Sequence, residues 1–195
     1  LWHNYGSTLP KYATELRYTA YLDIADACAE GALNDNKVYL RANKSRRQEI
    51  RYAAKVGVST IERFDPDLFQ RFYKLVFKRQ QLEPSPPTEE ILGVMRKLDD
   101  AGRLRMFVSE TSSGEVGSIA VFGVDMKRAY YLYGANDPAQ RNSHTGTAVL
   151  WGGFQSLSTD TREVDLEGVN SPMRGYFKLS FGAELCPYFH VKLVN

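Results

Sequence analysis

The 195-residue chain is 43% hydrophobic and 12% aromatic, which suffices for one globular domain with a sizeable core. Its formal net charge of +2 is too small to indicate nucleic acid or any other strongly charged partner. No apolar run approaches the roughly 18 residues of a membrane span and no segment has the pattern of a signal peptide, so we expect a cytoplasmic protein without an integral membrane segment.

The two cysteines, Cys28 and Cys186, cannot form a disulfide framework, and neither has a Cys or His at metal-ligand spacing. We interpret both as small side chains in a reducing compartment and expect no metal site.

Residues 1 to 36 have no clear overall periodicity and predict an arm or linker that packs on another part of the protein. Within it, residues 18 to 24 favour a strand, and residues 24 to 33 favour a short helix that ends at Asn34-Asp-Asn36.

A helix is predicted from Lys37 to Ala54, with Asp35 or Asn36 as its N-cap and Gly57 as its stop. Residues 37 to 55 hold seven basic residues and one acid, and six of the basic residues fall three or four apart as one stripe: Lys37, Arg41, Lys44, Arg47, Arg51 and Lys55. The stripe is either a solvated face or a surface that meets substrate phosphates, and in the second interpretation Arg47 and Arg51 bind the acceptor.

The middle of the chain alternates strand and helix patterns. Residues 58 to 63 favour a strand, Asp65-Pro66 opens an amphipathic helix, and Thr88 begins another that stops at Gly102. Residues 103 to 110, 117 to 124 and 129 to 133 then predict an antiparallel three-strand meander.

The chain is organised around residues 128 to 155, where a strand leads through a loop into a helix with small residues at its start. Free N–H groups and the helix dipole make such a helix start a site for anions. Gly146 and Ala148 would let a phosphate or a pantetheine-like arm approach the backbone. A strand at 163 to 168, a helix at 173 to 180 and a strand at 186 to 193 complete a mixed α+β fold, in which helices flank a mostly antiparallel, twisted sheet.

The loop in this stretch resembles the acyl-donor loop of the GNAT superfamily of N-acyltransferases, whose pattern is Gln or Arg, two residues, Gly, one residue, and Gly or Ala. Gly146 and Ala148 match the last two places, whereas Ser143 occupies the first and Arg141 lies two residues earlier. Further motifs are similar to the FemAB-like branch, which includes peptidoglycan aminoacyltransferases: Tyr133-Gly134-Ala135 with Asp137-Pro138, Phe177-Lys178, Phe181-Gly182, Glu184 and Pro187-Tyr188.

The resemblance runs from about Lys37 to Val194 and implies a GNAT-like sheet whose fourth and fifth strands splay apart to admit the donor. It implies transfer of an acetyl, acyl or aminoacyl group from a CoA-, carrier- or tRNA-linked donor to an amine on a cell-envelope precursor, a sugar or a small molecule. Acyl-CoA or aminoacyl-tRNA would be the co-substrate, with no tightly bound cofactor, and phosphate-bearing small molecules or tRNA would be the partners.

FemAB-like proteins often carry two GNAT-like domains. Because the chain begins at Leu1 rather than Met, we expect residues 37–195 to form the acyltransferase domain, and residues 1–36 to be an arm that follows an absent N-terminal domain. A homodimer is the alternative arrangement.

Direct transfer needs placement of the two substrates and stabilisation of an oxyanion, so no side-chain triad is required. The resemblance makes Lys178 a phosphate or transition-state contact, with Glu167 as a candidate base and Tyr176 or Tyr133 as a proton donor to the leaving group. Asp137 is a further candidate for binding the acceptor. The donor site would comprise Tyr133, Gly134, Arg141, Ser143, His144, Thr145, Gly146, Thr147 and Ala148.

Each candidate also has a structural interpretation: Glu167 pairs with Arg174, His144 caps or packs, Asp137 belongs to a turn, and Lys178 reaches out of the core. Two other functions stay open. Ser143 at the first place of the pattern favours a GNAT-fold binding or scaffold module that has lost its chemistry. The basic stripe allows RNA binding, although only Tyr39 and Tyr52 are interleaved with it.

Overall fold

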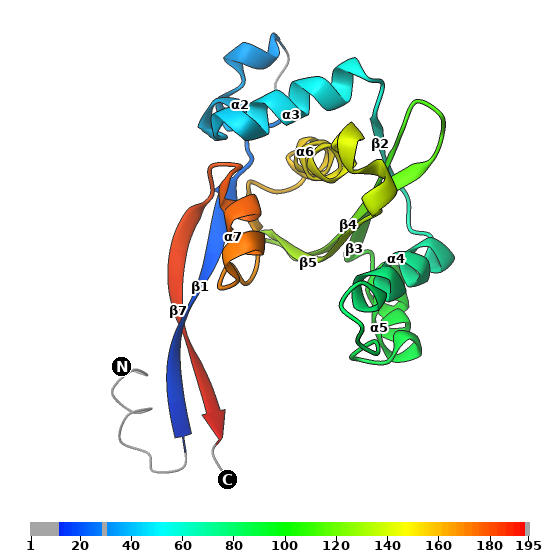
Figure 1. Cartoon of the computed structure of the whole chain (residues 1–195). Helices are drawn as coiled ribbons and strands as arrows, with labels where there is room; N and C mark the ends of the chain where they lie inside the picture. The colour runs from blue at the N-terminus through cyan, green and yellow to red at the C-terminus, as the bar shows by residue number, and fades with distance from the viewer. Residues whose placement is uncertain (1–11, 29–30, 194–195) are drawn as a thin grey trace.

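A seven-stranded sheet with the strand order β2-β3-β4-β5-β6-β1-β7 is the centre of the computed structural model, which describes residues 12–28 and 31–193 (Figure 1). The strands are β1 (Tyr12–Asp23), β2 (Ser59–Glu62), β3 (Leu104–Glu110), β4 (Val116–Val124), β5 (Ala129–Asn136), β6 (Glu163–Asp165) and β7 (Glu184–Leu193). Every pairing is antiparallel except that of β5 with β6. The predicted mixed, mostly antiparallel α+β sheet is therefore confirmed.

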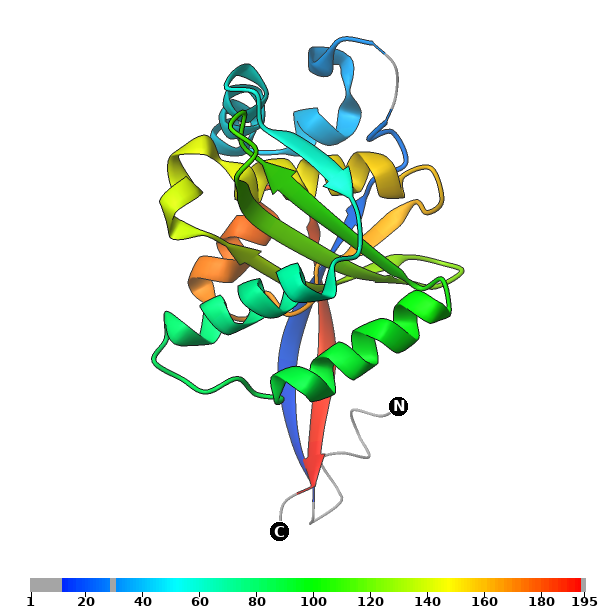
Figure 2. The ribbon, with the colours of Figure 1, turned by 90° about the vertical axis from the view of Figure 1, so that its right-hand side faces the viewer.

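Helices cover both faces of this sheet. They are α2 (Lys37–Arg41), α3 (Lys44–Lys55), α4 (Pro66–Lys78), α5 (Thr88–Asp100), α6 (Thr145–Leu157) and α7 (Pro172–Leu179), with short 3-10 helices η1 (Leu33–Asp35) and η2 (Pro138–Ser143). Helix α6 lies on one face together with α2 and α3, and helices α4 and α5 lie on the other (Figures 1 and 2). Among the described residues, no helix is both long and apolar enough to cross a bilayer.

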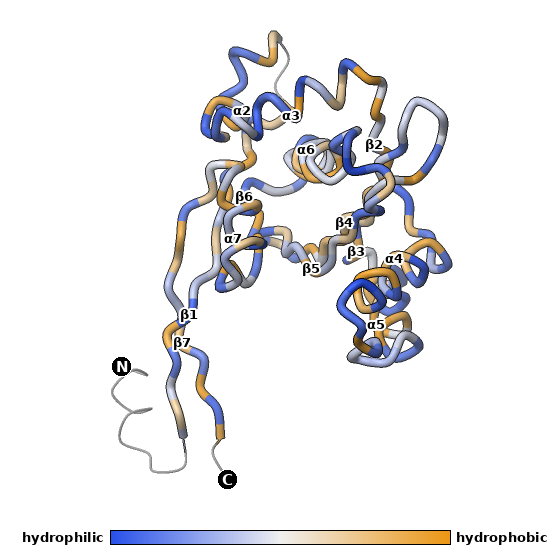
Figure 3. The backbone as a smooth tube through the Cα atoms, in the orientation of Figure 1, coloured by the Kyte–Doolittle hydropathy of each residue, from blue (hydrophilic) through white to orange (hydrophobic). Residues whose placement is uncertain are grey.

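Alternation along β3 and β4 produces two separate hydrophobic cores, because neighbouring side chains point to opposite faces. Phe107 and Phe122 pack towards α6, whereas Met106 and Val121 pack towards α4 and α5. The covering helices are amphipathic, as the mixture of hydrophobic and hydrophilic segments along α4 and α5 shows in Figure 3. The site described below lies beside β5, whose residues Tyr131 and Tyr133 pack against different cores.

The predicted elements from β2 to β5 are confirmed. Asp65 caps α4 by accepting a hydrogen bond from the Leu68 amide at 2.9 Å, and Gly102 follows α5 with a φ of +63°. The meander pairs β3 with β4 and β4 with β5, as the alternation and the two short turns predicted.

The prediction of one helix from Lys37 to Ala54 is wrong, because the chain breaks at Ala42 and Asn43, which are both extended. Asn43 then caps α3 by accepting from the Arg46 amide, while its own amide donates to the Ser180 carbonyl. The expected basic stripe is therefore not one helix face. Lys37 and Arg41 form ion pairs with Asp26 and Asp23, respectively.

The N-terminal region also differs from the prediction. No helix spans 24 to 33 in the described residues, where turns at 25 to 28 precede η1. Strand β1 begins at Tyr12 and belongs to the same sheet as the rest of the chain, so part of the expected arm completes the fold. Residues 1–11 of that arm lie outside the described residues. Beyond the sheet, β1 and β7 continue together as a two-stranded ribbon (Figure 1).

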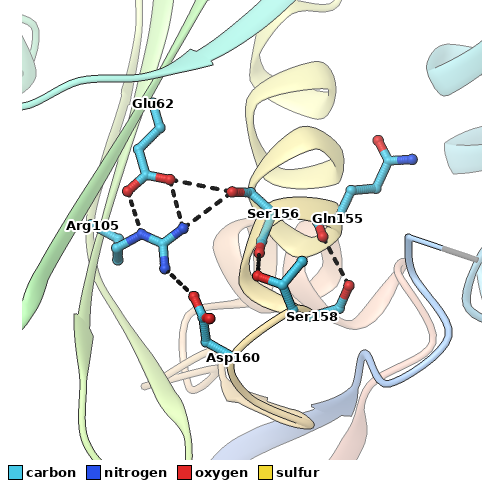
Figure 4. A network of polar contacts seen from close by, with 7 residues as sticks. Glu62, Arg105, Gln155, Ser156, Ser158 and Asp160 are labelled. Atoms are coloured by element: carbon cyan, nitrogen blue, oxygen red, sulfur yellow. Dashed lines mark hydrogen bonds and ion pairs between the residues drawn. The ribbon is translucent and has the colours of Figure 1, made fainter.

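A polar network fixes the C-terminal end of α6 to the edge of the sheet (Figure 4). The guanidinium of Arg105 on β3 donates to both oxygens of Glu62 on β2, to Asp160 at 2.5 Å and to the Ser156 hydroxyl at 3.1 Å. These charge-assisted hydrogen bonds raise the pKa of Arg105, with Glu62 as the main cause. The network holds the C-terminal end of α6 in place, and this helps to set the position of its N-terminal end.

Arg46 fixes the N-terminal end of α6. Its guanidinium is buried and donates to Glu49 on the same helix, to Thr147 near the start of α6 and to Ser180 after α7, the last at 2.9 Å. The Cζ atom of Arg46 lies 4.3 Å from the centroid of the Phe177 ring, so the cation also packs on an aromatic face. One buried charge thus joins α3, α6 and α7, and burial lowers the pKa of Arg46.

We expect Arg46→Ala to reduce the free energy of unfolding by about 3 kcal/mol or more, because Glu49 would lose the cation that compensates its charge. Urea unfolding followed by circular dichroism measures this. Arg47→Ala is the matched control, since Arg47 forms no ion pair in the part of the chain that the structure describes, and it should change stability by about 0.5 kcal/mol at most. Equal unfolding midpoints for the two variants would show that Arg46 does not anchor the helices.

Candidate active site

The site begins where β5 and β6 part. Their parallel pairing covers only Ala129 with Val164 and Tyr130 with Asp165. Beyond this point the chain after β6 turns to β1 instead: the amides of Leu166 and Val169 donate to the carbonyls of Ala20 and Tyr18. From Tyr131 onwards, therefore, β5 has no described strand partner on the β6 side, and a gap opens in the sheet.

A bulge in β5 lies beside this gap. Val121 pairs with Tyr133 and Phe122 with Tyr131, so Leu132 is an extra residue. The bulge turns the two tyrosines to opposite faces: Tyr131 packs in the core below α6, 5.3 Å from the Phe122 ring, and Tyr133 packs with the core of α4. The strand thus presents a phenol on each side of the gap.

Gly134 allows Tyr131 to lie along the strand. A Cβ at position 134 would be only 1.6 Å from the Tyr131 hydroxyl oxygen, so any larger residue would displace the ring. Burial raises the pKa of Tyr131 to about 12, and it also raises the pKa of Tyr133. Both phenols therefore stay protonated near neutral pH and can donate hydrogen bonds.

A cleft of about 810 Å³ passes along this edge of β5 and reaches both faces of the sheet. Residues 131 to 136 of β5 form one side. On the face of α6 and α7, the cleft is lined by Gly146, Val149, Glu167, Met173, Arg174, Phe177 and Lys178. On the opposite face, it is lined by Phe69, Tyr73, Val76, Phe77, Arg79, Gln80, Ser85 and Ile119.

Glu167 contributes the one carboxylate among the residues that line the cleft. It has a φ of +56°, which is unusual for a residue other than glycine. The buried Asp165 holds this conformation by accepting hydrogen bonds from the Glu167 amide at 2.8 Å and from the Thr19 hydroxyl. Partial burial, together with the negative charge of Asp165, raises the pKa of Glu167.

Lys178 on α7 supplies a cation to the same part of the cleft. Its ammonium donates to the Gly168 carbonyl at 3.3 Å and lies 5.2 Å from the centre of the Tyr131 ring. Burial lowers the pKa of Lys178, although Glu167 opposes this shift. No carboxylate forms an ion pair with Lys178 among the described residues, so its charge is available to a ligand.

The start of α6 meets the cleft at Gly146, where an added Cβ would lie 2.6 Å from the Asn136 side-chain oxygen. The other residues predicted for the donor loop point elsewhere. Thr145 bonds to Ser118 at 2.8 Å, Thr147 donates to Glu49 at 2.5 Å, and the Ala148 carbonyl accepts from Thr60. The expected contact of residues 143 to 149 with the cleft is thus made through Gly146 and Val149.

Several predicted site residues lie away from the cleft. Tyr176 is 66% exposed on α7, and Asp137 caps η2 by accepting from the Ala139 amide at 2.9 Å. His144 precedes α6 with a φ of +54°, and its ring meets the edge of Tyr52. The remainder are exposed or half-buried residues that do not line the cleft: Arg47, Arg51, Arg141 and Ser143.

The guanidinium of Arg51 donates to the Tyr39 hydroxyl at 3.0 Å. Neither Arg47 nor Arg51 forms an ion pair in the described parts of the chain, and the role of both in acceptor binding stays a prediction.

Sequence reasoning missed the aromatic side chains of α4 that line the cleft. The Tyr73 ring stacks on Phe69, approaches Phe77 at 5.0 Å and meets the edge of Tyr133 at 5.8 Å. Spacing of four residues between Phe69, Tyr73 and Phe77 was the available signal, but it also fits a helix face in a core. Tyr131, Arg174 and Asp165 were missed as well, because their roles depend on the parting of two strands.

The cleft can thus hold a polar reacting group beside Lys178 and Glu167, and it can hold apolar groups against α4. A cation and protonated phenols can stabilise an oxygen that gains negative charge, and a carboxylate of raised pKa can accept a proton. Among the described residues, no group of three or more His, Cys, Asp or Glu side chains is arranged to hold a metal ion.

Comparison with known families agrees with this geometry. The family model described as the acetyltransferase (GNAT) domain matches residues 41–176, well over half of the chain. No curated protein matches the sequence.

Solved structures with low sequence identity share the fold. FemX superposes with a TM-score of 0.71 and 13% identity over 95% of this chain and 64% of FemX. A conserved protein of unknown function from Bacteroides thetaiotaomicron gives 0.68 and 11%, over 100% of this chain and 66% of that one. The C-terminal domain of a putative lysylphosphatidylglycerol synthetase from Agrobacterium fabrum gives 0.62 and 12%, over 95% and 62%. The chain spans slightly less than two thirds of each.

Gly134→Ala should lower the melting temperature by several degrees, because the new methyl group would displace the half-buried Tyr131 ring at a cost of about 1–3 kcal/mol. Gly93→Ala on α5 is the matched control: a Cβ there meets nothing within 4 Å, so the variant should be as stable as the native protein or slightly more so. Differential scanning calorimetry compares the two. An unchanged melting temperature for Gly134→Ala would contradict the packing of Tyr131 on this strand.

Proposed function

Because the chain belongs to the family of GNAT acetyltransferase domains, we propose that it is an N-acyltransferase whose reaction takes place in the gap beside β5. One observation carries this proposal. The edge of β5 beyond Tyr130, the ammonium of Lys178 and the carboxylate of Glu167 all meet in one cleft that opens on both faces of the sheet.

Transfer in this cleft would be direct. The neutral amine of the acceptor attacks the carbonyl carbon of an acyl thioester, so that an N–C bond forms and the C–S bond then breaks. The amine loses one proton, and the departing thiolate gains one. Atoms and charge balance without an oxidant, a metal ion or a covalent enzyme intermediate.

The cleft offers a group for each of these steps. Lys178 stabilises the oxygen that becomes negative in the tetrahedral intermediate, because its charge is partly desolvated and has no internal carboxylate partner in the described residues. Glu167 accepts the proton of the amine, and its raised pKa suits that role. Of the two protonated phenols, Tyr131 lies on the face of α6, where the donor would enter, and donates to the leaving thiolate, whereas the predicted donor Tyr133 lies on the face of α4.

The donor would enter on the face of α6. Gly134 and Gly146 would let a pantetheine-like arm approach the backbone, and the start of α6 would meet the arm at Gly146. Acyl-CoA is the donor that the family favours, while a carrier- or tRNA-linked donor is retained from the FemAB-like resemblance. The same resemblance favours an acceptor amine on a cell-envelope precursor, a sugar or a small molecule.

Residues 37–195 would carry the transfer site, with β1 completing their sheet, and an N-terminal domain or a second copy of the chain is proposed as partner. Arg47, Arg51 and Asp137 would contact an acceptor only if it extends beyond the cleft, because none of the three lines it.

A binding module without turnover is the second candidate, and Ser143 favours it. The GNAT pattern has Gln or Arg at this place, and the nearby Arg141 is exposed at the end of η2. Binding of acetyl-CoA without any acyl transfer to a panel of amines would support that candidate instead.

Lys178→Ala should lower turnover by about a hundredfold or more, the effect of losing one preorganised donor at an oxyanion. Its melting temperature should hardly change, because the ammonium forms no ion pair among the described residues and contacts only the Gly168 carbonyl and the Tyr131 ring. Release of free CoA from acetyl-CoA with an amine panel measures turnover, and Lys74→Ala, at an exposed position on α4, is the control. Native turnover in Lys178→Ala would remove this residue from the mechanism.

The pH profile of turnover should have two limbs of opposite sign. Glu167 acts as its carboxylate, so activity falls as the pH drops through its raised pKa, and Glu167→Gln should lose most activity together with this acid limb. Lys178 acts as its ammonium, so activity falls as the pH rises through its lowered pKa. Stopped-time assays at constant ionic strength give both limbs. An acid limb that persists in Glu167→Gln would assign it to another group.

A further inference from the structure

We infer that the acceptor of this enzyme carries its amine on an apolar, aryl or branched-alkyl group, which binds against the aromatic wall of α4. The inference rests on the proposed acyl transfer and concerns the class of its second substrate. By aromatic wall we mean the α4 and β5 side chains on that face of the cleft: Phe69, Tyr73, Val76, Phe77 and Tyr133.

The two ends of the cleft differ in chemistry. On the face of α7, Glu167, Arg174 and Lys178 give it charged groups. On the face of α4, the lining is aromatic or aliphatic apart from Arg79, Gln80 and Ser85. A ligand that fills both ends therefore needs one polar and one apolar part.

The aromatic wall is a rigid surface. Tyr73 contacts Phe69, Phe77 and Tyr133 with ring centres between 5.0 and 5.8 Å apart, and its hydroxyl donates to the Pro86 carbonyl at 2.7 Å. The phenol oxygen is therefore satisfied by the protein and directed away from a ligand. Val76 and Phe77 are only half-buried, so apolar area at this end remains open to contact.

The position of the wall favours the acceptor over the donor. Gly146 and the start of α6 lie on one face of the sheet, and α4 packs on the other. An amine attacks the carbonyl carbon from above or below the plane of the thioester, so the acceptor need not lie on the same face of the sheet as the donor arm, and the gap beyond Tyr130 connects the two faces. Tyr133 and Phe77 line the cleft on the α4 face, so a substrate that reaches Glu167 from this face would contact them.

Burial of an aryl group against such a wall is favourable because it removes apolar area from water. A small polar amine has no comparable apolar area to bury there, and its hydroxyl group would lose water. We therefore expect 2-phenylethylamine to bind at least tenfold more tightly than 2-aminoethanol, which presents the same primary amine without an apolar group.

The test uses the full chain and measures binding separately from turnover. Three proteins are compared: the native protein, Phe77→Ala and Val94→Ala. For each, ligand-observed NMR gives the Kd of 2-phenylethylamine and of 2-aminoethanol, and calorimetry gives the Kd of acetyl-CoA. Val94 is 46% exposed on α5 and does not line the cleft, so it controls for a change of apolar surface. A variant with an altered circular dichroism spectrum is replaced by Val76→Thr.

The expected result is weaker binding of 2-phenylethylamine in Phe77→Ala by about fivefold or more, with the Kd of acetyl-CoA unchanged and Val94→Ala like the native protein. Equal binding of the two amines by the native protein, or no effect of Phe77→Ala, would overturn the inference while leaving acyl transfer intact. Calorimetry with hexanoyl-CoA tests the alternative: if Phe77→Ala weakens the binding of hexanoyl-CoA but not that of 2-phenylethylamine, the wall holds the acyl chain and the inference is overturned. Failure of acetyl-CoA to bind at all would count against the proposed function instead.

Discussion

The site depends on one constraint: β5 and β6 stay paired for only two residue positions. The carbonyls of β1 accept hydrogen bonds from the amides of the chain beyond Asp165, so this part of the chain cannot pair with β5 beyond Tyr130. An unpaired strand edge inside a sheet normally costs free energy unless water or a ligand bonds to it. Here the edge faces a cleft, so backbone polar groups of β5 can form hydrogen bonds with a substrate. The bulge at Leu132 adds a phenol on each side of the same opening.

Two buried or half-buried polar networks hold the helices that surround this opening. Arg105 joins β2, β3 and the end of α6, while Arg46 joins α3, the start of α6 and the end of α7. Helix α6 is thus fixed at both ends, and α7 is fixed where it carries Lys178. This arrangement keeps Lys178 and Glu167 partly desolvated, and neither has a partner of opposite charge in direct contact among the described residues. Partial desolvation of a charge costs free energy, and a substrate group of opposite charge can offset that cost when it binds.

Sequence patterns predicted the strands of the meander, the helices α4, α5, α6 and α7, and the family, because alternation, capping residues and glycine stops are local signals. They did not predict the break at Ala42 and Asn43, which depends on a contact with Ser180, distant in sequence. Residues Lys178 and Glu167 were proposed from motif and position, and both line the cleft. Sequence patterns could not distinguish the aromatic wall and Asp165 from ordinary core residues, because the role of these residues arises only where two strands part. The basic stripe seemed continuous only because the helix was assumed to be unbroken.

The central claim is that a CoA-linked donor lies along the free edge of β5. Amide chemical shifts of the isotope-labelled protein, recorded during titration with acetyl-CoA, test it most directly. The account predicts saturable shifts at residues 131 to 136 of β5, at Gly146 and at Lys178, with none at Arg47 or Arg51 on α3. Shifts confined to α3, with β5 unaffected by saturating acetyl-CoA, would contradict it.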